Sequence, residues 1–335
     1  MNVRKRRMPA EWERQRAVIM AFPNPETDWS YIIEEARGQF TEIIGALTSE
    51  GVKVILVCKD RKSVIRHLKF VDLSLIEFFE TDYNDTWTRD YGPITIEEEG
   101  KTKELDFGFN GWGLKFAADK DNLVNLKLTS TDRYENNRDF ILEGGSIESD
   151  GRGTIMTTTR CLTSLNRNGG RNKDELEKIL SERLGAERVL WIDFGYMEGD
   201  DTDSHVDTLA RLAPNDTILY VKCIDENDPQ KEELDRMEKQ LKNFTTREGK
   251  PYRLLPLPLP SPIYDDDGQR LPATYANYLV TDEVVFVPKY RQRNNDEKAL
   301  ETIAQAFPER RLRMVDCRCL IKQHGSLHCT TMQVY

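Results

Sequence analysis

The chain of 335 residues is 38% hydrophobic and 32% charged, with 14 prolines and 20 glycines, which excludes a disordered, fibrous or low-complexity protein. Its 58 Asp and Glu residues outnumber its 48 Lys and Arg residues, and the resulting net charge of −10 argues against nucleic acid or an anionic membrane as the main partner. A cationic small molecule fits this charge better, and the length suits roughly two domains or one large single architecture.

Strand-length apolar runs alternate with amphipathic stretches along the chain. In order, the pattern predicts a strand at 16–22, a helix at 29–50, a strand at 52–58, a charged helix at 60–70 and short strands near 75–80 and 93–97. It continues with strands at 153–162, 188–193, 217–223 and 278–290, helices at 173–185, 229–243 and 296–307, and a last strand at 328–335. Such alternation is typical of an α/β protein.

The N-terminus begins with a basic cluster, but the charged stretch from Trp12 to Arg16 interrupts the apolar run that a secretory signal would need. No run of about 18 apolar residues follows, so no membrane helix is predicted. The six cysteines are scattered, four of them in or beside apolar runs, which predicts buried free thiols rather than a disulfide framework. We therefore expect a cytoplasmic protein.

Glycine and proline motifs are less informative. The pairs Gly144-Gly145 and Gly169-Gly170 do not continue as a dinucleotide-binding or phosphate-binding loop. Prolines at 256, 258, 260 and 262 predict a surface crossing or an edge segment rather than a polyproline recognition motif.

Cys329 lies six residues from the C-terminus and directly follows His328. Neighbouring residues of a strand point to opposite faces, so an extended segment would keep these two side chains apart. His205 and Asp207 are a better pair, because residues two apart on a strand face the same way, about 6.5–7 Å apart along it. That separation is about the width of a small planar substrate, although an isolated His-x-Asp is more often a surface pair.

Carboxylates also stand where apolar runs meet turns. Asp90 precedes a Gly-Pro turn, and Glu143 precedes two glycines, which suits a site although such residues often only cap turns. Nearby anions raise the pKa of a thiol, so Cys329 would need a cation to become nucleophilic. A guanidinium is such a cation, and carboxylates can hold it with two parallel hydrogen bonds.

Metal sites are not predicted. His324 and His328 are four residues apart, but Gly325 stands where a zinc-protease motif needs its glutamate. The acidic run from Asp201 lacks the glycine of a calcium loop at its sixth position and the glutamate at its twelfth.

Six segments, taken in order and spacing, resemble the agmatine deiminases, a family of the guanidine-modifying superfamily that also contains arginine and peptidylarginine deiminases. They are EWERQRAVIMAFP, NDTWTRDYGP, LEGGSIESDGRGTIMTTTRCLTSLNRN, DTDSHVDTLARL, PATYANYLV and QHGSLHCTT. The resemblance covers nearly the whole chain. It implies one domain over 1–335, a five-bladed α/β-propeller (pentein) of pseudo-symmetric ββαβ units, with the site in the central channel and the C-terminal strand at the axis.

The resemblance also implies roles for five residues. Cys329 corresponds to the nucleophile, His205 to the general acid and base, Asp90 and Asp207 to the carboxylates that hold the guanidinium, and Glu143 to the acid that supports the histidine. The implied reaction converts agmatine to N-carbamoylputrescine and ammonia through a covalent thiouronium, as a step of putrescine biosynthesis. No cofactor is expected, and the family suggests a homodimer or a larger homo-oligomer.

The tail of agmatine ends in an ammonium, which favours acidic or aromatic neighbours, whereas arginine needs a basic partner for its carboxylate. Trp12 and Trp87 are candidate walls of the substrate channel, or else core aromatics. Asp201 and Asp203 are candidates to attract the ammonium, or else part of a solvated loop. The segment 323–328 departs from the glycine run of the family, because it contains His324.

Three other interpretations stay open at this point. The protein could be a deiminase of free or peptidyl arginine, or a catalytically silent member that binds guanidines or polyamines. It could also be a structural α/β domain with incidental buried cysteines, in which case replacing Cys329 by serine would change no activity.

Overall fold

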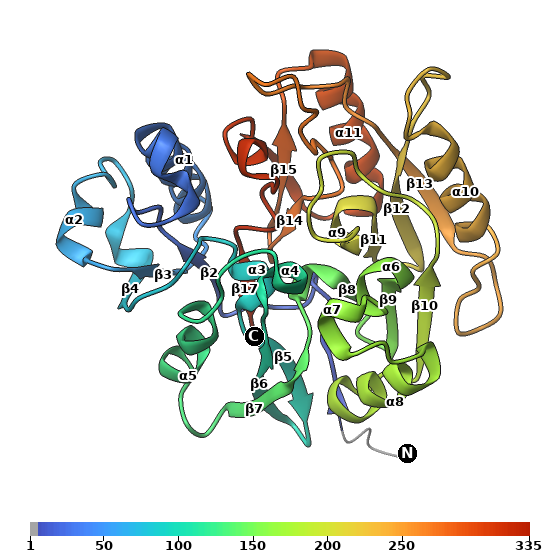
Figure 1. Ribbon diagram of the computed structural model, residues 1–335, viewed down its shortest axis with the longest axis horizontal. Coiled ribbons are helices and arrows are strands. Elements are labelled where there is room, and N and C mark those ends of the chain that lie inside the picture. Colours follow the sequence, from blue (N-terminus) through green and yellow to red (C-terminus); the bar gives the residue numbers. More distant parts are fainter. Residues whose placement is uncertain (1–5) are drawn as a thin grey trace.

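The computed structural model describes residues 6–335 (Figure 1). Within this range the strands form five small sheets rather than one large sheet. The first residues of the basic N-terminal cluster, 1–5, lie outside the described residues.

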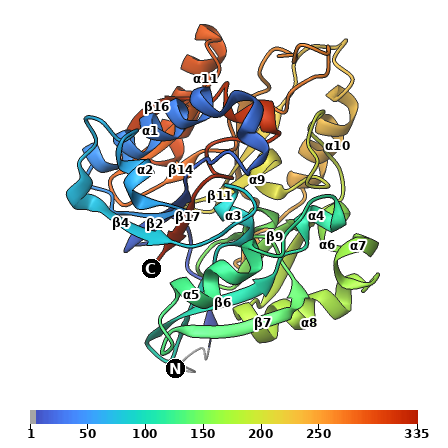
Figure 2. The same cartoon turned by 60° about the vertical axis from the view of Figure 1, so that its left-hand side comes forward.

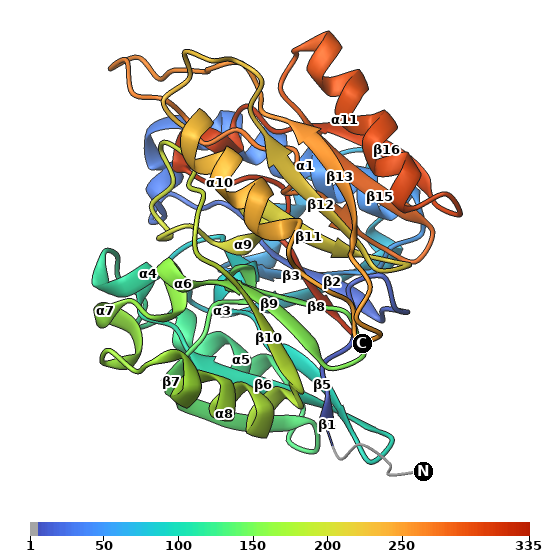
Figure 3. The ribbon, with the colours of Figure 1, turned by 90° about the vertical axis from the view of Figure 1, so that its right-hand side faces the viewer.

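The first sheet joins the two ends of the chain. Its order is β17 (Met332–Val334), β2 (Ala17–Ala21), β3 (Val54–Cys58) and β4 (Ile76–Glu80), with helices α1 (Ile33–Ser49) and α2 (Arg61–Ile65) in the crossovers. Strand β17 pairs antiparallel with β2, and β2, β3 and β4 are parallel. Figure 1 shows the C-terminus in front of the centre of the molecule, and Figure 3 shows it at one face. The pairing of β17 with β2 holds this end of the chain in the sheet.

The other four sheets follow in chain order. The second contains β1 (Arg6–Arg7), β5 (Ile94–Glu98), β6 (Lys101–Gly108) and β7 (Tyr134–Ile141), with α3 (Thr88–Tyr91) before it and α4 (Gly111–Leu114) and α5 (Val124–Leu128) before β7. The third contains β8 (Ile147–Ser149), β9 (Thr154–Thr158) and β10 (Arg188–Ile192), with α6 (Thr159–Leu162), α7 (Leu165–Asn168) and α8 (Lys173–Leu184) between the last two.

The fourth sheet contains β11 (Ala210–Ala213), β12 (Thr217–Lys222) and β13 (Arg253–Pro258), with α9 (Val206–Leu209) before it and α10 (Lys231–Leu241) in the crossover. The fifth contains β14 (Leu279–Val280), β15 (Val284–Lys289) and β16 (Arg311–Asp316), with α11 (Arg293–Ala306) in the crossover. Figure 3 shows α10 and α11 along the outer side of these two sheets.

One pairing pattern recurs in all five sheets: two antiparallel strands, a helical crossover, and a parallel strand. This is the ββαβ unit that the family resemblance implies. Helix α1 shows why the helices pack as they do, because Phe40, Ile43, Ile44 and Leu47 recur at helical spacing and are buried. Helix α1 contacts both β3 and β16, so the first and last units touch (Figure 2).

A single cluster of buried apolar side chains runs from Ala17 to Val334 and joins the five sheets. The predicted α/β class is therefore confirmed, whereas closure of the five sheets into a propeller stays a prediction. All six cysteines are buried and unpaired, as predicted. No helix of residues 6–335 combines the length and apolar character needed to cross a bilayer.

Four predicted elements are wrong in part. The helix predicted at 60–70 is the single short helix α2, which ends at Ile65. The run 278–290 forms two antiparallel strands, β14 and β15, separated by a turn at Asp282-Glu283. The run 153–162 is a strand only to Thr158 and continues as α6. The last strand begins only at Met332, because the preceding residues form turns. The proline-rich segment was predicted correctly, since β13 is the edge strand of its sheet.

Candidate active site

Each of the five units places a polar side chain in one region, from the segment just before its first antiparallel strand. These residues are Asp90 before β5, Glu143 before β8, Asp207 before β11, Asn277 before β14 and Cys329 before β17. All five are buried. The repeated fold thus brings together residues that are up to 239 positions apart, from Asp90 to Cys329.

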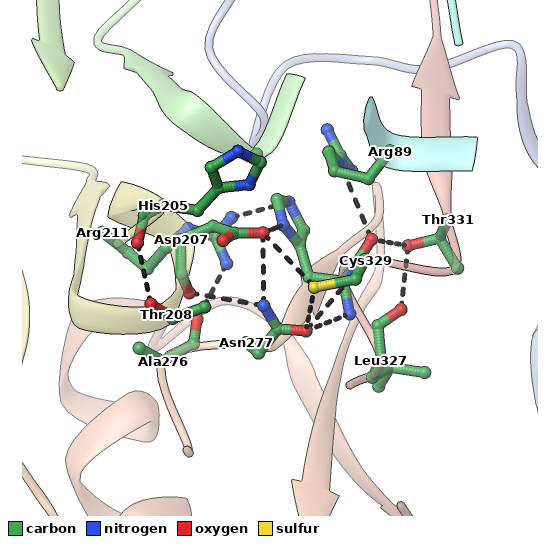
Figure 4. A network of polar contacts seen from close by, with 12 residues as sticks. Arg89, His205, Asp207, Thr208, Arg211, Ala276, Asn277, Leu327, Cys329 and Thr331 are labelled. Atoms are coloured by element: carbon green, nitrogen blue, oxygen red, sulfur yellow. Dashed lines mark hydrogen bonds and ion pairs between the residues drawn. The ribbon is translucent and has the colours of Figure 1, made fainter. Parts of the chain in front are cut away.

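Cys329 lies in a turn, not on the strand that we predicted. Its Sγ is 3.8 Å from Asp207 Oδ2 and 3.4 Å from Asn277 Oδ1 (Figure 4). The amide of Asn277 fixes this turn, because its Oδ1 accepts hydrogen bonds from the backbone N–H groups of His328 and Cys329. Burial, and then the charges of Asp207 and Asp90, raise the pKa of the Cys329 thiol well above its ordinary value. The sulfur is therefore protonated in the empty site.

His205 also differs from its predicted conformation, because it caps the short helix α9 instead of lying on a strand. Its Nδ1 is 3.6 Å from Asp90 Oδ1, and neither ring nitrogen has a hydrogen-bond partner within the described chain. Burial opposes a charge on the ring, but Asp90, Cys161 and Glu143 together raise the pKa of His205 well above its ordinary value. This direction favours the imidazolium form, which can donate a proton.

Gly145 marks the point where three of these side chains converge. A Cβ added there would lie 2.7 Å from His205 Nδ1, 2.8 Å from Asp90 Oδ1 and 3.0 Å from Asp207 Oδ2. Its backbone N–H donates to Asp90 Oδ1 at 3.0 Å. Position 145 therefore needs a glycine, since the Cβ of any other residue would push the His205, Asp90 and Asp207 side chains apart.

Asp90 is held from its other side by a residue that the sequence analysis missed. Trp112 Nε1 donates to Asp90 Oδ2 at 2.9 Å. Residues 111–114 all have positive φ angles between 55° and 88°, a strained turn that two glycines make possible. Burial, with smaller contributions from Asp207 and Glu143, raises the pKa of Asp90 to about 6.

Glu143 does not hydrogen-bond to His205. Both of its carboxylate oxygens accept from Arg167 Nε, at 2.8 and 3.0 Å, and both side chains are fully buried. Arg167 also binds Asp203, which in turn pairs with Lys115. Glu143 can therefore act on His205 through its charge, and Asp203 is occupied by two cations instead of lining the cavity.

A cavity opens above Cys329 and is strongly acidic. Besides Asp90 it is lined by four further aspartates, Asp28, Asp85, Asp200 and Asp201, and by the aromatic rings of Trp87, Trp112 and Phe116. None of the residues that line it is Lys or Arg. Burial is the main reason that the pKa of Asp85 is raised to about 7 and that of Asp201 to about 6.

Trp12, a predicted wall of the channel, does not line this cavity. It is partly buried against the core, and its carbonyl accepts a hydrogen bond from Arg310. Trp87, the other predicted wall, does line the cavity and packs against Trp29, with ring centroids 5.7 Å apart.

Two clusters in the described chain have residue types that bind metals: Glu143, Cys161 and His205, and Glu11, Glu148 and His328. In both clusters arginines already neutralise the carboxylates, Arg167 in the first and Arg89 and Arg211 in the second. We therefore assign no metal to either cluster.

Residues 7–334 match the family model of the Porphyromonas-type peptidyl-arginine deiminases. The chain belongs to this family. A Photobacterium profundum protein named "Putative agmatine deiminase" is 31% identical over 353 residues, which cover 98% of this chain and 95% of that protein.

Solved structures agree with this assignment. A cysteine-to-serine variant of C. jejuni agmatine deiminase with substrate bound is 37% identical, with a TM-score of 0.91 over 98% of this chain and 96% of its own. A "putative peptidyl-arginine deiminase" is 45% identical, with a TM-score of 0.94 over 100% and 99%. These matches indicate a hydrolase that acts on a guanidino C–N bond.

The segment 323–328, which contains His324, borders the cavity with its first three residues. Gln323, His324 and Gly325 line it, and Gly325 fits closely over Trp87, where an added Cβ would lie 2.2 Å from a ring carbon. His324 adopts a left-handed conformation with φ of 63°, and its Nδ1 lies 2.8 Å from the carbonyl oxygen of Gly199. The bulk of His324 is thus directed to a backbone partner at the rim.

Proposed function

We propose that this protein is an agmatine deiminase that hydrolyses agmatine to N-carbamoylputrescine and ammonia, as a step of putrescine biosynthesis. Two kinds of support exist: relatives over the whole chain carry that name, and the buried Cys, His and carboxylate cluster suits a guanidinium. In this proposal Asp90 and Asp207 bind the guanidinium nitrogens, and the substrate carbon lies next to Cys329 Sγ.

The first half of the reaction forms a covalent intermediate. The bound cation favours ionisation of the Cys329 thiol, which releases its proton to water, and the thiolate attacks the guanidinium carbon. His205, already protonated, gives its proton to the departing nitrogen. The C–N bond breaks, ammonia leaves, and an S-alkylthiouronium remains on Cys329.

The second half returns the enzyme to its starting state. Neutral His205 takes a proton from a water molecule as that water attacks the thiouronium carbon. The C–S bond then breaks, the hydroxyl proton passes to the sulfur, and the ureido product is released. No step requires a cofactor, and His205 is again an imidazolium.

The observation that carries the choice of substrate is the lining of the cavity. Four aspartates beyond Asp90, with no Lys or Arg, attract a terminal ammonium and repel a carboxylate. Agmatine has the ammonium alone, whereas free arginine has a carboxylate beside its ammonium. The same lining disfavours a silent structural domain, which has no reason to collect buried acids with raised pKa values around a thiol.

The test is a comparison of substrates at pH 8, where Asp201 is ionised. Agmatine, arginine, an arginine-containing peptide and butylguanidine, which lacks the ammonium, are incubated with pure protein while ammonia and ureido product are measured. We expect agmatine to give by far the highest kcat/KM and Cys329→Ser to give no product. Asp201→Asn should raise KM for agmatine about tenfold or less, as expected for a partly exposed ion pair, and leave KM for butylguanidine unchanged.

Two outcomes would contradict the proposal. Preference for arginine or the peptide would assign the enzyme to another deiminase activity. Product formation by Cys329→Ser would remove the thiol from the mechanism.

A further inference from the structure

His328 is a fully buried histidine between two carboxylates. Its Nδ1 lies 2.7 Å from Asp207 Oδ2, and its Nε2 lies 2.7 Å from Glu11 Oε1. Arg211 Nη2 also lies 3.1 Å from Nε2, and Arg89 Nε donates to the backbone carbonyl of His328. The ring therefore connects a predicted substrate-binding residue to the N-terminal segment of the chain.

The two contacts restrict the protonation state of the ring. A neutral imidazole has one N–H donor and one acceptor, whereas an imidazolium has two donors. Each ring nitrogen faces a carboxylate oxygen at hydrogen-bond distance, so only the imidazolium makes both contacts favourable. Burial, and then the charges of Arg211 and Arg89, hold the pKa of His328 below its ordinary value, while Glu11 and Asp207 act in the opposite direction. The inference of a protonated ring therefore rests on its two carboxylate contacts at 2.7 Å.

Asp207 is held by one of its oxygens only. Its Oδ2 accepts from His328 and, at 3.2 Å, from Asn277 Nδ2, and it lies 3.8 Å from Cys329 Sγ. Its Oδ1 is buried and has no hydrogen-bond partner in the described chain. This arrangement leaves Oδ1 free, with a fixed direction, for a guanidinium N–H.

Glu11 is anchored well enough to fix the ring. It lies in the loop before β2, and its carboxylate pairs with Arg89 at 3.0 Å and with Arg211, both of which are buried. The charges of His328, Arg211 and Arg89 hold the pKa of Glu11 well below its ordinary value even though burial opposes ionisation. Glu11 is thus an anion with three cationic neighbours.

We propose that Glu11 is a positioning residue for substrate binding: through a protonated His328 it orients the Asp207 carboxylate so that Oδ1 stays available. The inference deepens the proposed function, because it takes Asp207 as a ligand of the guanidinium. Glu11 itself does not line the cavity that contains Cys329.

The test uses Glu11→Gln, which keeps the shape and removes the charge. Glu148→Gln is the matched control. Glu148 is buried, pairs with the same Arg211 and lies within 4.8 Å of the His328 ring, but within residues 6–335 it forms no hydrogen bond or ion pair with His328 or Asp207. We expect Glu11→Gln to raise KM for agmatine at least tenfold and to change kcat less than threefold, the pattern of lost uniform binding. Glu148→Gln should change KM less than twofold; equal effects of the two variants would overturn the proposal.

A second measurement needs no substrate. The chain has only four histidines, so ¹⁵N-histidine spectra are simple, and His328→Gln identifies the His328 signals. In the wild-type protein at pH 7.5 we expect both ring nitrogens of His328 to be protonated, and in Glu11→Gln only one. A neutral ring in the wild type, or an unchanged ring in Glu11→Gln, would overturn the proposal. Failure to turn over agmatine would instead refute the proposed function and leave this result interpretable.

Discussion

Replacement of Gly145 by alanine tests the convergence of the site directly. The new Cβ would lie 3.0 Å or less from atoms of His205, Asp90 and Asp207, distances that Cβ atoms essentially never adopt. Relief requires shifts of several tenths of an ångström in three buried side chains. Overpacking of this kind costs about 1–3 kcal/mol of stability, and misplacement of reacting groups by about 1 Å costs about 100-fold in rate.

We therefore expect Gly145→Ala to fold, with a melting temperature lowered by a few degrees, and to lose about 100-fold in kcat/KM for agmatine. Activity is measured as ammonia release and stability by calorimetry. Gly38→Ala is the control, because Gly38 lies in α1 with open space around it, and alanine there should stabilise the helix by about 1 kcal/mol or less. Wild-type kcat/KM in Gly145→Ala would refute the convergence of the three side chains on this glycine.

Three further predictions concern individual contacts. The pKa of Asp90 is raised to about 6, so its carboxylate gains a proton and stops holding the guanidinium as the pH falls through 6. We expect kcat/KM to drop about tenfold for each pH unit below 6. A kcat/KM that stays constant down to pH 5 would contradict this prediction. Trp112→Phe removes a hydrogen bond to that carboxylate and should raise KM about tenfold or more, whereas Trp191→Phe, whose indole bonds a glutamate of α8, should not. Arg167→Met leaves a buried glutamate unpaired and should lower the free energy of unfolding by about 3–5 kcal/mol. Arg293→Met, which removes an exposed ion pair, is the control. Equally small changes in the two variants would contradict a stabilising role for the buried pair.

The sequence was sufficient to predict those elements whose residues are buried on both faces. Strands such as β3 and β12 are nearly continuous apolar runs, and their predicted limits agree with the structure within two residues. Strands β6, β7 and β16 were missed because charged residues occupy their exposed positions and hide the apolar face. The fivefold repeat could not be read from periodicity, since the repeated feature is strand pairing, not residue identity.

The site shows the same limit. Cys329, His205, Asp90 and Asp207 were singled out by residue type and resemblance, and the structure brings them together. The extended conformations predicted for Cys329, His205 and Asp207 were wrong, because turns and short helices before strands look extended in sequence. Asn277 was missed within an apolar segment, since only its contact with Cys329 reveals its role. Its position before the first strand of a unit is the signal that could have found it.

Acids outnumber cations around Cys329. Four carboxylates, Asp90, Asp207, Glu143 and Glu11, lie within 4 Å of His205, His328, Arg89, Arg167 or Arg211, when His328 is protonated as we infer. The cavity adds four aspartates, and no Lys or Arg lines it. A thiolate at Cys329 would add an unbalanced negative charge, which agrees with the raised pKa of this thiol. In the proposed mechanism a bound guanidinium supplies a compensating positive charge, and we expect the thiolate to form only when the substrate is present.

This coupling predicts a preference between two alkylating reagents of nearly the same shape. Chloroacetamidine carries a positive charge and chloroacetamide is neutral, so only the first can stabilise the thiolate that attacks its chloromethyl carbon and displaces chloride. The rates of Cys329 modification by the two reagents are followed by mass spectrometry at pH 7.5. We expect the ratio of the chloroacetamidine rate to the chloroacetamide rate to be at least tenfold higher for Cys329 than for glutathione under the same conditions. Asp90→Asn should reduce that preference, because it removes one of the carboxylates that bind the cation. Equal selectivity in the enzyme and in glutathione would mean that the thiol is ionised before the cation arrives.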